Sequence, residues 1–361
     1  MVRFDSTKGV VVGRGGGRFA RFAVIAAALA LAGGVLVAGS PAEAKLAPIH
    51  VGSVSTIVAR ADALNNEANA TLNYAEQAAH EAGTALVIDD AAFRVAKLAG
   101  ERTLEGAHYV PFKDRLVSSS VPAQYAYPVR IAAYGVETLA SGAPDPQKGC
   151  AGSGDYYVFS RASAASPWRA TLEPFVARIS ALPAFASHHG HGDFAGSSGL
   201  SIPVSAMGSA LVRALEGRAA TGAGNALVPA IDYANSNSCA HPVFWDPRLF
   251  TGARNGLAFT SRIGAVTPSD AVGFATVGGG ALVALTIREQ YTERPQVSGD
   301  YVQWNHGSFT PWDLLAVGHY SSVTVVVDQQ VLVLDPPAAG GPAHVVGAYD
   351  GVVSVTGTPV G

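Results

Sequence analysis

The chain has 361 residues, a net charge of −3 at pH 7 and only 14% charged residues. A mildly acidic chain without a block of lysines or arginines argues against nucleic acid and anionic lipid headgroups as partners. Because 48% of the residues are hydrophobic and few are charged, we expect apolar burial to stabilise the fold and salt bridges to be few.

The first 44 residues have the pattern of a secretory signal peptide. Arginines precede an uncharged run of 17 residues at 22–38, and Ala42 and Ala44 supply the small residues of a cleavage site. We expect cleavage after Ala44, which would leave a net charge of −6 because the removed segment holds five basic and two acidic residues. The alternative is an uncleaved N-terminal anchor, since 17 residues are at the short edge for a membrane span. Either outcome predicts a secreted or extracytoplasmic protein with no membrane span after residue 44.

Two cysteines, Cys150 and Cys239, lie in turn-rich stretches 89 positions apart. An even count in an exported chain favours a disulfide bridge. Such a bridge would stabilise the fold by roughly 4–5 kcal/mol in the chain-entropy view. The alternative is a pair of free or separately buried thiols.

Helices are expected at the start of the mature chain. Apolar residues recur every three or four positions over 53–80, which predicts an amphipathic helix capped by Ser53. Gly83 is expected to end that helix at its C-cap position. A second helix is predicted over 89–98, followed by a loop over 101–126.

Strands are expected after these helices, because alternating or continuous runs of β-branched and aromatic residues are bounded by turn residues. A further helix is predicted over 204–215. The polar triplet Asp328-Gln329-Gln330 indicates a hairpin turn between two of the strands. The predicted strands cover 127–139, 155–162, 168–176, 257–263, 272–277, 281–291, 323–327, 331–334 and 345–355.

This order predicts an α+β fold, because helices come first and antiparallel strands follow in each half. We expect two tandem domains, 45–182 and 201–361, joined by a Gly- and His-rich linker over 183–200. A helix laid across a strongly curved sheet is the cone shape of nuclear-transport-factor-2-like and cystatin-like folds, and we expect that shape for each domain.

Several short motifs resemble a domain of unknown function from exported actinobacterial proteins. They lie at 66–71, 156–159, 167–174, 315–320 and 335–337. The resemblance implies an exported, cell-envelope protein, implies no activity, and marks Asn66, Asn69, Trp168 and Arg169 as positions to test. Asn66 and Asn69 are three residues apart and share a helix face, so buried amides there could bond the sheet backbone. Trp168 is expected to bury a large apolar area.

The histidines form one candidate metal group, because His188, His189 and His191 precede Asp193. We expect a solvated linker there and no metal, since flexible ligands bind weakly. No nucleotide, phosphate-loop or nucleophile motif is present in the sequence, so no cofactor is predicted.

Strand residues are the remaining candidates for chemistry. Glu137, Tyr134, Tyr156, Glu289 and Tyr291 could face the mouth of a cone, where a carboxyl group with a raised pKa would support acid–base catalysis. We therefore expect a non-enzymatic module or scaffold that binds an envelope protein or a small apolar ligand. The alternative is a cone-fold enzyme, a small hydrolase or isomerase, that uses strand carboxylates.

Overall fold

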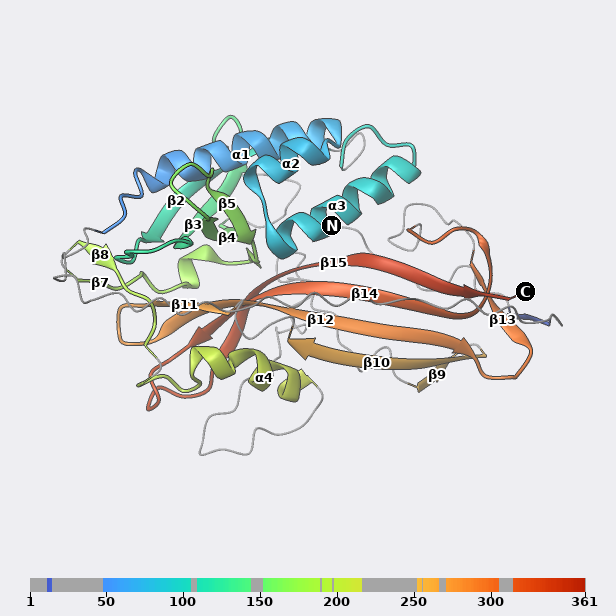
Figure 1. The fold of residues 1–361 in the computed structure, drawn as a ribbon. Coiled ribbons are helices and arrows are strands. Elements are labelled where there is room, and N and C mark those ends of the chain that lie inside the picture. The colour runs from blue at the N-terminus through green and yellow to red at the C-terminus, as the bar shows by residue number, and fades with distance from the viewer. Residues whose placement is uncertain are drawn as a thin grey trace, which may run out of the picture.

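The computed structural model describes residues 12–14, 48–104, 109–143, 152–188, 190–196, 198–215, 252–254, 256–265, 271–304 and 314–360. Helices α1, α2 and α3 lie along one side of a long antiparallel sheet, and helix α4 lies on the other side (Figure 1). The helices are α1 (Val54–Thr71), α2 (Tyr74–His80), α3 (Gly83–Leu98), the short 3-10 helix η2 (Ile179–Ala181) and α4 (Val204–Leu215).

The main sheet has the strand order β2-β3-β4-β6-β15-β14-β12-β10-β9. Strand β5 also pairs with β4, β11 with β12, and β13 with β14 and β1, while β7 and β8 form a separate hairpin. The strands are β1 (Val12–Arg14), β2 (Phe112–Ser120), β3 (Val129–Leu139), β4 (Gly154–Arg161), β5 (Arg169–Leu172), β6 (Phe175–Val176), β7 (Ser187–His188), β8 (His191–Gly192), β9 (Gly252–Arg254), β10 (Leu257–Ala265), β11 (Val272–Ala275), β12 (Ala281–Pro295), β13 (Asp300–Trp304), β14 (Gly318–Asp335) and β15 (His344–Pro359). The predicted α+β class is therefore confirmed.

The two predicted domains share this sheet. The two-residue strand β6 pairs with β4 through Gly154 and with β15 through Ala348, so it joins the strands of the two halves. One apolar cluster contains Tyr156 from the first half and Leu332 from the second, together with Phe185 from the predicted linker. The two halves of the chain are therefore connected through one sheet and one apolar cluster.

The two faces of the sheet are covered differently. On one face, helix α4 buries Met207 and Leu211 against alternating residues of β12 and β14, including Val283 and Val331. Helix α1 packs Val58 and its neighbours against β3 and β4, and the opposite side of these two strands packs against β14 through Tyr156 and Leu332. Helix α3 crosses β15, where Ile88 lies so close to Gly351 that a Cβ there would come within 2.7 Å of its side chain. The glycine permits the close approach of helix and sheet.

The predicted hairpin at 323–334 is wrong, because β14 runs without a turn from Gly318 to Asp335. The triplet that suggested a turn is buried in the middle of this strand. Asp328 is satisfied by Arg288, whose Nε and Nη2 donate to its carboxylate at 2.6 and 2.7 Å. Gln330 donates to Thr84 at 3.1 Å. Long-range partners thus allow polar residues to sit inside a central strand.

The single helix predicted over 53–80 is also wrong. Helix α1 ends at Thr71, and its C-cap residue Leu72 has a φ of 52° in the left-handed region. Asn73 then caps α2 by accepting from the Ala75 N–H at 3.0 Å. Gly83 begins α3 instead of ending a helix. The connection between α2 and α3 extends along β5, where the Ala82 N–H donates to the Ala170 carbonyl at 2.9 Å.

The loop predicted over 101–126 contains strand β2, which has alternating half-buried and exposed residues. Its charged outer residues hid the strand pattern. The helix predicted over 204–215 matches α4, because its apolar period is strong and local.

Some predictions fall outside the described residues. These are the bridge between Cys150 and Cys239, the apolar run at 22–38 and His189. Strand β1, within the predicted signal segment, pairs with β13. No helix in the described part of the chain has the length and apolar character that a membrane crossing requires.

Candidate functional site

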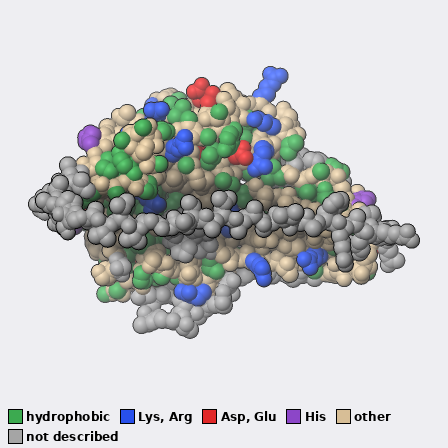
Figure 2. Space-filling model, viewed as in Figure 1, with side chains coloured by type: hydrophobic (Ala, Val, Ile, Leu, Met, Phe, Trp, Pro, Cys, Tyr) green, Lys and Arg blue, Asp and Glu red, His purple; other side chains and the backbone are tan. Residues whose placement is uncertain are grey.

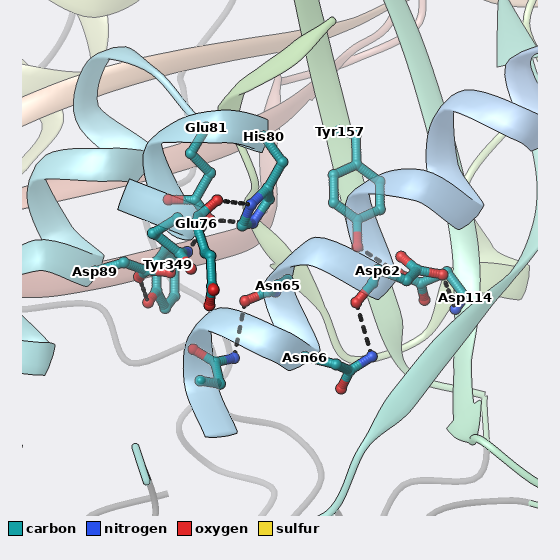
Figure 3. Close-up of polar contacts among 12 residues, drawn as sticks. Asp62, Asn65, Asn66, Glu76, His80, Glu81, Asp89, Asp114, Tyr157 and Tyr349 are labelled. Carbon is teal, nitrogen blue, oxygen red and sulfur yellow. Dashed lines mark hydrogen bonds and ion pairs between the residues drawn. The ribbon is translucent and has the colours of Figure 1, made fainter. Parts of the chain in front are cut away.

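A row of carboxyl groups lies between the helices α1–α3 and the sheet. We call this row the acid layer, and it consists of Asp62, Glu81, Asp89, Asp114, Glu137, Asp155 and Glu173. These groups are close enough for the charge of one to raise the pKa of another, as Asp155 and Glu137 do for Asp62. Figure 3 shows part of this layer, with carboxyl groups from helices and strands pointing toward one another.

The centre of the acid layer is a carboxyl pair, Glu81 and Asp89. The amide of Gln77 donates to both, with 2.6 Å between its Nε2 and Asp89 Oδ2. The Tyr349 hydroxyl donates to the other oxygen of Asp89, which joins α3 to β15. All these contacts are made away from water, because Glu81 and Gln77 are completely buried.

Burial sets the protonation of this pair. It raises the pKa of Glu81 well above its ordinary value, and the charge of Asp89 raises it further. Burial also raises the pKa of Asp89 to about 6, although Tyr349, Glu81 and Gln77 donate to it and oppose the rise. Burial therefore favours the protonated form of Glu81, and two negative charges on this pair are disfavoured.

His80 lies next to this pair but forms no ion pair with it. Its Nδ1 is 3.2 Å from the Glu76 carbonyl oxygen, and its Nε2 is 3.3 Å from Glu81 Oε1. Burial lowers the pKa of His80 to about 4, so the ring is neutral at pH 7. The short distance to Glu81 is thus not an ion pair, because the imidazole is uncharged.

The α1 end of the acid layer holds the edge of the sheet. Asp62 accepts from the Asp114 N–H at 2.8 Å, and the Tyr157 hydroxyl donates to the Asp114 carboxylate. Burial raises the pKa of Asp62 to about 7. The side-chain amide of Asn66 pairs with Phe112 as a strand would, donating to its carbonyl at 2.6 Å and accepting from its N–H at 3.0 Å. Helix α1 therefore satisfies edge groups of β2.

This finding confirms the predicted role of Asn66 as an amide that bonds sheet backbone. Asn69 is buried as expected, but its amide donates to Asn65 within the helix, at 2.8 Å. Arg169 is exposed at the start of β5. Trp168 is half-buried, less than expected, and packs beside the α1 cluster.

A pocket of about 390 Å³ lies between the first turns of α1 and the turn that joins β4 to β5. Its lining includes Arg60, Arg161, Trp168, Ile57, Leu64 and His80. His80 connects this pocket to the Glu81–Asp89 pair, because its Nε2 contacts Glu81.

The turn between β4 and β5 holds Arg161 in place. Its Nε donates to the Ser166 carbonyl at 3.1 Å, and its Nη2 donates to the Ala164 carbonyl. The guanidinium lies 5.9 Å from the centre of the Trp168 ring, within range of a cation–π interaction. Neither Arg60 nor Arg161 forms an ion pair with another described residue.

The strand residues predicted for acid–base chemistry do not meet at one site. Tyr134 and Tyr156 pack with Phe185 in the apolar cluster, and Glu137 belongs to the acid layer. Glu289 and Tyr291 lie on the distant strand β12, where Glu289 accepts from Ser261 at 2.6 Å.

Sequence reasoning missed Gln77, His80, Glu81, Asp89 and Tyr349. Their one local signal is the spacing of Gln77 and Glu81, which are four residues apart around a helix end. The other contacts join residues far apart in the chain.

Among the described residues, no group of three His, Cys, Asp or Glu side chains is arranged to hold a metal ion. Comparisons of the chain with protein-family models, with curated proteins and with solved structures find no match. Any function must therefore be argued from the geometry itself.

Proposed function

We propose that this protein is an exported, non-enzymatic module that binds a small ligand carrying an anionic group, in the pocket between α1 and the β4–β5 turn. The observation that carries the proposal is the placement of Arg60 and Arg161 beside Trp168 at that pocket, without an ion pair to another described residue. A guanidinium that backbone carbonyls hold in place is pre-organised to bind a carboxylate, sulfonate or phosphate group by donating hydrogen bonds to it.

The rest of the pocket suits an apolar ligand body. Ile57 and Leu64 line it from α1, and Trp168 supplies an aromatic edge or face for a flat group. The expectation of an apolar ligand is thereby narrowed to one that also carries negative charge.

The acid layer behind the pocket does not oppose an anion. His80 lines the pocket and is neutral at pH 7, because burial lowers its pKa to about 4. Burial also raises the pKa of Glu81, which contacts His80, well above its ordinary value and so favours its uncharged form. Exposed charge on the face in Figure 2 is mainly basic, because many acidic side chains of this chain are buried.

The location outside the cytoplasm, the two cone-shaped domains and an envelope-protein partner remain proposals from the sequence. The enzymatic alternative has weaker support, because the strand carboxylates that it needs lie on different strands and faces.

Titration with anilinonaphthalene sulfonate tests the binding function, since this probe combines one anionic group with a flat apolar body. We expect saturable fluorescence enhancement by the purified full chain. Arg161→Gln should raise the dissociation constant about tenfold, which is equivalent to a loss of about 1.4 kcal/mol of binding free energy. Arg169→Gln is the matched control, because Arg169 is an exposed arginine near the pocket that does not line it.

The control should change the affinity less than about twofold, since an exposed charge outside the site contributes little. Equal affinities for native protein, Arg161→Gln and Arg169→Gln would contradict the proposed pocket.

A further inference from the structure

The β7–β8 hairpin lies within the stretch that the sequence predicted to be a solvated linker, and it is fixed at both ends. The Gly192 N–H donates to the Val121 carbonyl at 3.0 Å, next to a bridge between Gly192 and Pro122. A Cβ at Gly192 would come within 2.2 Å of Ser120 Oγ, so hairpin and β2 are in close contact. Before the hairpin, Phe185 forms a β-bridge to Thr276, just after β11. After the hairpin, Phe194 forms a β-bridge to Phe274 of β11.

This anchoring gives the histidines a defined spacing. His188 and His191 are directly opposite each other in the β7–β8 register. Opposite residues of an antiparallel pair project from the same face, with their Cβ atoms about 4.5–5.5 Å apart. Both side chains are exposed, and that of His188 is 75% accessible.

Asp193 fixes the orientation of one of these rings. Its carboxylate accepts from Nδ1 of His188, which leaves Nε2 of that ring with its lone pair available. A carboxylate on the far nitrogen of a histidine is the usual support for a metal-ligating imidazole, since it sets the tautomer and increases ligand basicity.

We propose that the β7–β8 hairpin is a surface site for a divalent transition metal ion, which His188 and His191 would hold through their imidazole nitrogens. The site is independent of the pocket at α1. No third described His, Cys, Asp or Glu completes it, so water would fill the other coordination positions.

The ligand chemistry defines the class of ion. Imidazole nitrogen suits Cu²⁺, Ni²⁺ and Zn²⁺, and Cu²⁺ binds a given nitrogen site most tightly among the divalent first-row ions. Mg²⁺ and Ca²⁺ require oxygen ligands and have no reason to bind two imidazoles. We therefore expect affinities in the order Cu²⁺, then Ni²⁺ or Zn²⁺, with no binding of Mg²⁺ at this hairpin.

Calorimetric titration of the untagged full chain with CuCl₂, ZnCl₂ and MgCl₂ tests the site. The double variant His188→Gln/His191→Gln should weaken Cu²⁺ binding by about a hundredfold or abolish it, since both ligands are lost. Asp193→Asn should weaken it by about 10–100-fold, because that variant removes only the group that orients His188. His344→Gln, at an exposed histidine of β15, is the matched control and should leave the affinity unchanged.

Electron paramagnetic resonance of the Cu²⁺-loaded chain gives a second readout. Nitrogen hyperfine structure from imidazole ligands should appear in the native protein and disappear in the double variant, whose fold is checked by circular dichroism. Unchanged Cu²⁺ affinity in the double variant, equal binding of Mg²⁺ and Cu²⁺, or no Cu²⁺ binding by the native chain would each overturn the site.

Discussion

The two sides of the molecule differ in what holds their helices to the strands (Figure 1). Helix α4 lies on a face built from alternating valines and leucines of β12 and β14, and its contacts there are apolar. The helices α1–α3 lie on the opposite side of the molecule, where α1 covers β3 and β4 and α3 crosses β15 (Figure 1). The acid layer and its hydrogen-bond partners are buried there between helices and strands. One sheet thus uses two kinds of packing.

The difference indicates separate roles for the two faces. Apolar packing stabilises through buried area and has little dependence on pH. Buried carboxyl groups that keep their protons stabilise less and make stability depend on pH. The pocket lies at the edge of the second kind of packing, so the polar face is where we expect function.

The largest effect should come from the apolar face. Leu211→Ala removes a completely buried side chain of α4 and should lower the free energy of unfolding by about 2–5 kcal/mol. Urea unfolding measures the change, which should be the same at acidic and at neutral pH. A loss that varies with pH would show that the two faces are not separate in their energetics.

A smaller effect should come from the edge of the polar face. Asn66→Ala leaves the Phe112 N–H and carbonyl without their amide partner and should cost about 1–3 kcal/mol. Glu67→Ala is the matched control, because Glu67 is an exposed residue of the same helix. Equal losses in the two variants would contradict the account of Asn66 as a cap on the strand edge.

The sequence predicted features that depend on neighbours in the chain. Helix α4 follows from its own apolar period, and the role of Asn66 follows from amides on one helix face. The buried triplet of β14 escaped prediction because Asp328 is satisfied by Arg288, a partner on another strand. The Asp89 site escaped for the same reason, since Tyr349 is 260 positions away.

The smallest expected effect concerns the protons of the acid layer. Because the folded-state pKa of Asp89 is about 6, the folded chain holds a proton that an unfolded Asp has released below pH 5. The contribution of Asp89 to the free energy of unfolding is therefore present at low pH and is lost as the pH rises through 6. Between about pH 5 and pH 8 the loss is about 1.4 kcal/mol, which corresponds to the one pKa unit between pH 5 and 6. The raised pKa of Glu81 acts in the same direction.

His80 acts in the opposite direction. Its folded-state pKa is about 4, so the unfolded chain takes up a proton below 6.5 that the folded chain does not, and stability falls as the pH drops. Variants that retain His80 in the same surroundings have the same contribution as the native protein. It therefore cancels when the pH profiles of native protein and variant are compared.

The most direct test is the free energy of unfolding of native protein and of Glu81→Gln/Asp89→Asn, measured in urea from about pH 5 to about pH 8. The variant mimics the protonated pair at every pH. We predict that native stability falls relative to the variant as the pH rises, by at least about 1.4 kcal/mol over this range. Parallel pH profiles for the two proteins would contradict the claim that buried, proton-bearing carboxyl groups hold the α1–α3 face together.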